Sequence, residues 1–148
     1  MKRILVIEDD PKHLDDAKNF FENEDVKVTY VSNYNDAIVV MLKWDAKNFK
    51  YVKGDVDGVI SDIYFPLTDD EQWNQPEPIG VRVAVELTQV GIPFVLNTAG
   101  YHHGRKYEWI GQFARGQRWT LIDNSGDHEK EAKSKNWKEA YSSILKKL

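Results

Sequence analysis

The chain contains no cysteine at all. This absence excludes disulfide bonds, zinc sites built on thiolates and thiol nucleophiles, and it fits the reducing cytoplasm where we expect the protein. Long apolar runs are missing too, since none approaches the roughly 20 residues needed to cross a bilayer. The apolar start, residues 4–7, meets Glu8, Asp9 and Asp10 after only four residues. We therefore expect neither a secretory signal nor contact with a membrane.

Positive charge is also in short supply. Lys and Arg number 20 against 24 Asp and Glu, which gives a formal net charge of −4. A mildly acidic domain lacks the basic surface that phosphate contacts require, so we expect no direct nucleic-acid binding. Nucleotide binding is disfavoured as well, because no Gly-rich phosphate loop follows the first apolar run. The length of 148 residues with 41% apolar residues predicts a single domain, residues 1–148, with one sizeable core.

Short apolar runs alternate with longer amphipathic ones, a pattern typical of an α/β protein in which helices cover a parallel sheet. The predicted strands cover residues 4–7, 26–31, 58–62, 92–96 and 119–122. The predicted helices cover residues 11–21, a segment capped at 33–36 and reaching residue 44, residues 79–87 and 108–114, and a last segment whose apolar face runs from residue 137 to residue 148. The last helix has a continuous apolar face, and we place Lys135 and Lys138 on its solvated side.

Acidic residues follow two of the predicted strands. Glu8, Asp9 and Asp10 end the first strand, Asp62 ends the third, and Thr98 follows the fourth. Right-handed crossovers bring these strand ends to one edge of the sheet, where crowded carboxylates favour a hard cation such as Mg²⁺. A carboxylate held beside Mg²⁺ can attack phosphorus. The residues alone therefore make Asp62 the candidate nucleophile, Asp9 a metal ligand and Thr98 a hydroxyl donor to the phosphoryl group.

Three segments carry a family resemblance: residues 2–10 (KRILVIEDD), 57–66 (DGVISDIYFP) and 92–99 (IPFVLNTA). Together they resemble the receiver domain of bacterial two-component response regulators, in the right order and over nearly the whole chain. The resemblance implies a flavodoxin-like (CheY-like) fold. In that fold a doubly wound, five-stranded parallel sheet has the strand order 2-1-3-4-5 and helices on both faces.

The same resemblance implies roles for individual residues. Glu8 and Asp9 match the acidic pair of the family, and Asp62 matches the phospho-acceptor. The backbone carbonyl of Tyr64 would complete a weak Mg²⁺ site, and Thr98 matches the hydroxyl that moves to meet the phosphate.

One departure from the family concerns charge. Receivers carry a Lys at the end of the fifth strand, whereas residues 119–124 read WTLIDN and no Lys lies between residues 118 and 126. On this interpretation Asp123 stands in the place of the lysine. Lys106, or Arg105, in the loop after the fourth strand would supply the positive charge instead. On this interpretation a small phosphodonor phosphorylates the protein slowly or not at all.

Other departures concern connections. The polar loop at residues 66–78 is longer than the family's short turn, and Gly80 then takes the part of the family's helix-opening glycine. Residues 44–52 form an aromatic extension between the second and third strands. The patch Tyr101-His102-His103-Gly104 follows Thr98 at the mouth of the predicted site.

The leading hypothesis is a stand-alone receiver-like module of a two-component phosphorelay, in which phospho-acceptance at Asp62 switches a protein-binding face. Its expected partners are a histidine kinase or another signalling protein, and a homodimer through the fourth helix, fifth strand and fifth helix. The alternative is a pseudo-receiver that binds proteins without phosphorylation. We do not expect an enzyme. A Mg²⁺-dependent phosphohydrolase would need a second acid two residues after the nucleophile, where Tyr64 stands.

Overall fold

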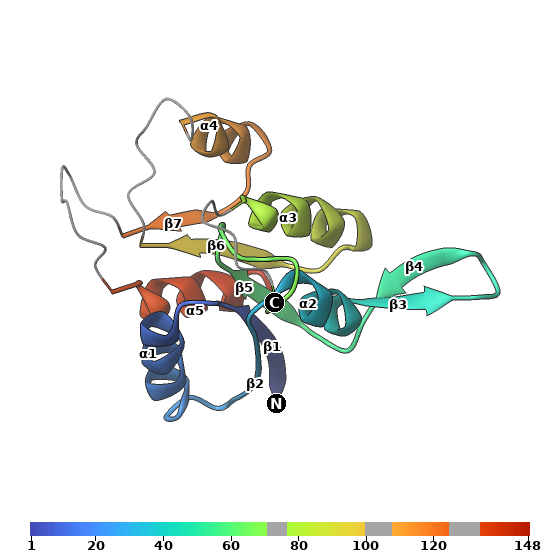
Figure 1. The fold of residues 1–148 in the computed structure, drawn as a ribbon. Coiled ribbons are helices and arrows are strands. Elements are labelled where there is room, and N and C mark those ends of the chain that lie inside the picture. The colour runs from blue at the N-terminus through green and yellow to red at the C-terminus, as the bar shows by residue number, and fades with distance from the viewer. Residues whose placement is uncertain (71–76, 100–107, 125–133) are drawn as a thin grey trace.

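The fold is described from a computed structural model, for residues 1–70, 77–99, 108–124 and 134–148 (Figure 1). In chain order the elements are β1 (Lys2–Ile7), α1 (Pro11–Phe21), β2 (Val26–Val31), α2 (Tyr34–Met41), β3 (Leu42–Asp45), β4 (Lys50–Lys53), β5 (Gly58–Ser61), α3 (Ile79–Val90), β6 (Phe94–Thr98), α4 (Glu108–Gly116), β7 (Leu121–Asp123) and α5 (Trp137–Leu145).

Five parallel strands form the central sheet in the order β2-β1-β5-β6-β7. Because β3 and β4 lie outside this sheet, the order is the predicted 2-1-3-4-5, and the flavodoxin-like fold is confirmed. The register pairs Ile7 with Ser61 and Thr98 with Asp123. The carboxyl ends of these strands therefore meet at one edge of the sheet.

Helices cover both faces of the sheet, with α1 and α5 on one face and α2 and α3 on the other (Figure 1). Alternate residues of β1 divide between the two cores, since Ile4 and Val6 pack toward α1 and α5 whereas Leu5 and Ile7 pack toward α2 and α3. The central strands are consequently buried on both sides, which is why they read as continuous apolar runs.

Side-chain caps fix where three helices begin. The Asp10 carboxylate accepts from the backbone N–H of Lys12 at 2.8 Å, and Pro11 occupies the first turn of α1. Asn33 accepts from the Asp36 N–H at 2.8 Å to start α2. Asn136 caps α5 in the same way. These contacts explain why the predicted starts near residues 11 and 34 agree with the structure.

The segment after α2 differs from the prediction. The helix ends at Met41 and does not reach Trp44, which lies in β3 and pairs with Tyr51 of β4 in an antiparallel hairpin. Two local features explain the hairpin. The Gly54 N–H donates to the Met41 carbonyl at 2.7 Å across its base, and the Asp45 carboxylate accepts from backbone N–H groups in the turn.

Some sequence-based expectations fall outside the described residues. They concern Lys106 and Arg105, the patch at residues 101–104, and the middle of the long loop at residues 71–76. Within the part of the chain that the structure describes, no helix is long and apolar enough to span a membrane.

Gly80 holds the start of α3 directly against the segment that carries Asp62. Its N–H donates to the Ile63 carbonyl at 2.8 Å. A Cβ atom at this position would lie 2.3 Å from the Asp62 carbonyl oxygen and 2.7 Å from the Ile63 Cα. Only glycine fits here without displacing backbone, in agreement with the helix-opening role that the family resemblance implied.

We predict that Gly80→Ala lowers the free energy of unfolding by about 1–3 kcal/mol, because backbone must move to admit the methyl group. Thermal and urea unfolding monitored by circular dichroism would measure the loss. Gly111→Ala in α4 is the matched control, because a Cβ there meets nothing within 4 Å. The control should be neutral or stabilising by up to about 1 kcal/mol. Equal effects of the two substitutions would contradict the tight contact at Gly80.

Candidate phosphoryl and metal site

Three carboxylates meet where β1 and β5 end. Oxygen atoms of Glu8, Asp9 and Asp62 all lie within 4.8 Å of one another. The backbone brings them together, since the Asp62 N–H donates to the Ile7 carbonyl at 3.0 Å and so extends the strand pairing by one residue. Glu8 is completely buried. The structure thus brings together the three acids that the strand ends predicted.

Burial and mutual repulsion shape the proton affinity of this cluster. Burial, reinforced by the charge of Asp62, raises the pKa of Glu8 to about 8. The same two causes raise the pKa of Asp9 to about 6. The carboxyl groups of Glu8 and Asp9 therefore keep their protons to higher pH than exposed carboxyl groups do.

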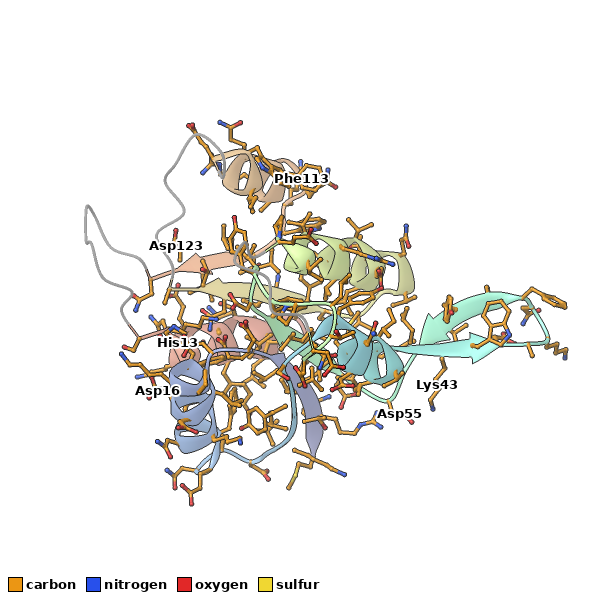
Figure 2. The ribbon with its side chains drawn as sticks, viewed as in Figure 1. His13, Asp16, Lys43, Asp55, Phe113 and Asp123 are labelled. Carbon is orange, nitrogen blue, oxygen red and sulfur yellow. The ribbon has the colours of Figure 1, made fainter. Side chains whose placement is uncertain are left out.

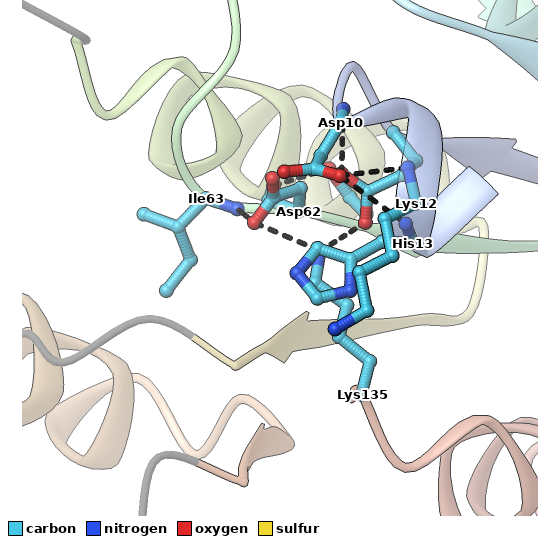
Figure 3. A network of polar contacts seen from close by, with 8 residues as sticks. Asp10, Lys12, His13, Asp62, Ile63 and Lys135 are labelled. Carbon is cyan, nitrogen blue, oxygen red and sulfur yellow. Dashed lines mark hydrogen bonds and ion pairs between the residues drawn. The ribbon is translucent and has the colours of Figure 1, made fainter. Parts of the chain in front are cut away.

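A buried lysine enters the cluster from the other end of the chain (Figure 3). The Lys135 Nζ donates to the Glu8 Oε1 and lies 3.2 Å from the Asp62 Oδ1. Only 2% of the Lys135 side chain is exposed. The prediction that placed Lys135 on the solvated side of the last helix is therefore wrong, because α5 begins only at Trp137.

This lysine also corrects the prediction about charge. Asp123 does end β7, but it is exposed and the cationic position beside Asp62 belongs to Lys135 (Figure 2). A lysine thus lies beside Asp62, and it follows the fifth strand of the sheet by twelve residues. Lys106 lies outside the described residues, and its role stays a prediction.

Two contacts return the chain to the site after β7. The Asn124 side-chain amide donates to the Ser134 carbonyl, which brings residues 124 and 134 together. Asn136 then caps α5 by accepting from the Glu139 N–H at 3.0 Å. Lys135 lies between these two fixed points. The Asn-x-x-Glu capping pattern was the sequence signal that could have shown that Lys135 precedes the helix.

The remaining predicted site residues lie on the neighbouring strand ends. Thr98, the last residue of β6, is buried. Tyr64 follows Asp62 by two residues and is half-buried. The Ile63 N–H donates to the Asp62 Oδ1 at 2.8 Å and fixes the orientation of that carboxylate. The roles of the Thr98 hydroxyl and the Tyr64 carbonyl stay predictions.

His13 is a site neighbour that the sequence did not single out. It lies in the first turn of α1 beside Lys135, and it is buried (Figure 3). Burial, followed by the charge of Lys135, lowers the pKa of His13. The neutral form of the imidazole is therefore favoured next to the ammonium group.

We predict that Lys135→Met destabilises the protein mainly at high pH. Because the pKa of Glu8 is raised in the folded state, its ionisation costs stability progressively as pH rises from about 4.5 through about 8. Lys135 opposes that cost, so its removal should lower the free energy of unfolding by about 3 kcal/mol at pH 8.5. At pH 5, where Glu8 is protonated, the loss should be roughly 1 kcal/mol.

Urea unfolding at the two pH values measures this difference. Lys138→Met is the matched control, since Lys138 is exposed on α5, and it should change the free energy of unfolding by less than about 0.5 kcal/mol. An equal cost of Lys135→Met at both pH values would contradict the pairing with Glu8.

The chain was compared with known proteins in sequence and in structure. No protein-family model matches the chain, and no curated protein matches it in sequence. Solved structures do match. A response regulator receiver domain protein (CheY-like) from Methanospirillum hungatei JF-1 is 15% identical with a TM-score of 0.60, over 99% of this chain and 93% of that chain.

The non-phosphorylated HemR receiver domain from Leptospira biflexa is 13% identical with a TM-score of 0.53, over 99% of this chain and 93% of that one. At such identities the likeness concerns the path of the backbone. It agrees with the sheet order and with helices on both faces. The chain has the fold of response regulator receiver domains.

Proposed function

We propose that the protein is a receiver-like signalling module that accepts a phosphoryl group on Asp62 with the help of Mg²⁺. One observation carries the proposal: the Lys135 ammonium lies 3.2 Å from the Asp62 Oδ1, inside the cluster formed with Glu8 and Asp9. A carboxylate flanked by a buried cation and by oxygen ligands for a second cation has the arrangement that phosphoryl transfer requires.

The acids fit a magnesium ion. Two oxygens bound to one Mg²⁺ at about 2.1 Å lie no more than about 4.2 Å apart, so oxygens within 4.8 Å need only small side-chain adjustments. Asp9 and Asp62 would hold the ion, with Glu8 close by, and the Tyr64 carbonyl is proposed as a further ligand. The bound ion would neutralise charge on the transferred group.

The chemistry is a displacement at phosphorus. A carboxylate oxygen of Asp62 attacks the phosphorus of a phosphodonor, such as acetyl phosphate or a phosphohistidine. An acyl–phosphate bond forms while the bond from phosphorus to the leaving group breaks, and the leaving group departs with the electron pair. Lys135 would pair with a phosphoryl oxygen in place of the Asp62 carboxylate, and the Thr98 hydroxyl would donate to another.

The proposed output surface comprises α4, β7 and α5. On α4 the large side chains Trp109 and Phe113 are 45% and 39% exposed. Figure 2 labels Phe113 on this helix. Apolar side chains exposed on one helix favour a protein partner. A histidine kinase would supply the phosphoryl group, and this face would bind the downstream partner or a second copy of the chain.

A phosphorylation-independent pseudo-receiver is the competing function. Its main support in the sequence was the missing lysine, whereas the ion pair of Lys135 with Asp62 favours phospho-acceptance. A phosphohydrolase is disfavoured, because Tyr64 stands where such enzymes carry a second acid.

We predict that Mg²⁺ binds with millimolar or weaker affinity and that its affinity rises between pH 5 and pH 8. The metal competes with protons on Asp9 and Glu8, whose pKa values are raised to about 6 and about 8. Amide chemical shifts near Asp9 during a Mg²⁺ titration would measure the dissociation constant at each pH. Asp9→Asn should weaken binding at least tenfold, whereas Asp123→Asn should not. Binding that does not depend on pH would contradict a site made of these acids.

We predict that the wild-type protein gains one phosphoryl group from acetyl phosphate in the presence of Mg²⁺, as followed by intact-mass spectrometry. Asp62→Asn should abolish the gain. Lys135→Met should slow it by about 100-fold, because one charged partner of the transferred group is lost. Lys138→Met is the matched control and should react like the wild type.

Two outcomes would contradict the proposal. If Asp62→Asn still gains the phosphoryl group, the acceptor lies elsewhere. If the wild type gains none under conditions in which Mg²⁺ binds, the pseudo-receiver is the better description. Slow reaction that depends on Lys106 and not on Lys135 would restore the interpretation drawn from the sequence.

A further inference from the structure

The hairpin β3–β4 projects from the body of the domain and adds no strand to the central sheet (Figure 1). Its base is tied down by the Gly54 N–H, which donates to the Met41 carbonyl at 2.7 Å. A second tie is the ion pair between Lys43 and Asp55, with 2.7 Å between Nζ and Oδ2 (Figure 2). The hairpin is thus a fixed projection whose outer half meets solvent.

Three aromatic side chains gather on this projection. Trp44, Phe49 and Tyr51 are 54%, 82% and 59% exposed. Their rings touch edge to face, with centroids 5.1 Å apart for Trp44 and Tyr51 and 6.4 Å apart for Trp44 and Phe49. Aromatic surface that is ordered yet open to water is characteristic of binding surfaces.

The hairpin is positively charged within an acidic chain. Residues 42–53 carry four lysines and one aspartate, a formal charge of +3, whereas the whole chain carries −4. The remaining residues therefore carry −7. Strands of four residues plus the turn extend roughly 15–20 Å, about twice the Debye length of ~8 Å at physiological ionic strength. The field at the outer half is therefore set by the hairpin's own lysines.

The backbone of the hairpin also favours a ligand of extended shape. Within the described residues, β3 and β4 pair only with each other, so each has an outer edge of backbone groups outside any sheet. An extended segment can pair with such an edge while its side chains contact the aromatic face. Isolated two-stranded hairpins are marginally stable in water, so an added strand would stabilise this one.

We propose that the hairpin binds an extended, acidic segment of a partner protein. Apolar side chains of that segment would cover Trp44, Phe49 and Tyr51, and its carboxylates would pair with Lys47, Lys50 and Lys53. This surface is separate from the acid cluster around Asp62, and the inference goes beyond the proposed phosphoryl chemistry.

Charge argues against the other occupants. A nucleic acid or an anionic membrane extends past the hairpin and would meet the −7 of the remaining residues. The tip of the hairpin is unsuited to insertion into a lipid bilayer, since Lys47 and Asn48 lie beside Phe49 there. A symmetric contact between the hairpins of two copies would place positive charge against positive charge. A short acidic segment avoids all three problems.

The test is a selection of 12-residue random peptides on the immobilised full chain. The selected peptides are then labelled, and their binding is measured by fluorescence polarisation. We expect the selected peptides to be enriched in Asp, Glu and apolar residues. The double variants Trp44→Ser/Tyr51→Ser and Lys47→Glu/Lys50→Glu should each weaken their binding at least tenfold. Lys18→Glu in α1 together with Lys27→Glu in β2, both exposed, is the matched control for charge reversal and should change binding less than twofold. Far-UV circular dichroism would verify that all variants stay folded.

Several outcomes would overturn the proposal. The selection could give no peptide whose binding depends on the hairpin. The selected peptides could also lack acidic residues. A single-stranded dT12 oligonucleotide, or vesicles containing phosphatidylserine, could bind the hairpin more tightly than any peptide. Concentration-dependent self-association that is lost in the hairpin variants would instead identify a second copy of the chain as the occupant.

Discussion

A single ammonium group, that of Lys135, compensates the charge of the acids at the edge of the sheet where β1 and β5 end. It donates to Glu8 and lies beside Asp62, so it joins the end of β1, the end of β5 and the approach to α5. Without it, a completely buried glutamate would face two further carboxylates with no compensating charge. The strand pairing of β1 and β5 places the acids, and Lys135 supplies the positive charge among them.

The pairing also explains an otherwise unfavourable arrangement. Three acids against one base leave the site with excess negative charge, and burial raises the pKa of Glu8 and Asp9. A purely structural ion pair would be more stable with equal numbers of acids and bases. The proposed binding of a divalent cation and a phosphoryl group would account for the surplus of carboxylates.

Much of the fold could be predicted from the sequence because its signals are local. Buried parallel strands read as apolar runs such as residues 58–61, and helix starts are marked by caps such as Asp10 with Pro11. The acid cluster could be predicted for a topological reason, since parallel strands that end in acids must deliver them to one edge.

Two features, the position of Lys135 and the β3–β4 hairpin, could not be predicted from the sequence. They depend on contacts between residues distant in sequence or on a short pattern. Lys135 fits the spacing of the polar side of the last helix, and only the cap at Asn136 shows that the helix starts later. Its approach to Glu8 further depends on the contact between Asn124 and Ser134, which no periodicity reveals. The hairpin was not predicted because its four-residue, lysine-rich strands show too little alternation of polar and apolar residues to be distinguished from the end of a helix.

The close contact at Gly80 makes the spacing of two elements depend on the absence of one side chain. The backbone of Asp62 and Ile63 touches the first turn of α3 without space for a single methyl group. The distance between the end of β5 and the start of α3 is therefore set by backbone contact alone, and any larger residue at position 80 would move the segment that carries Asp62 away from the helix.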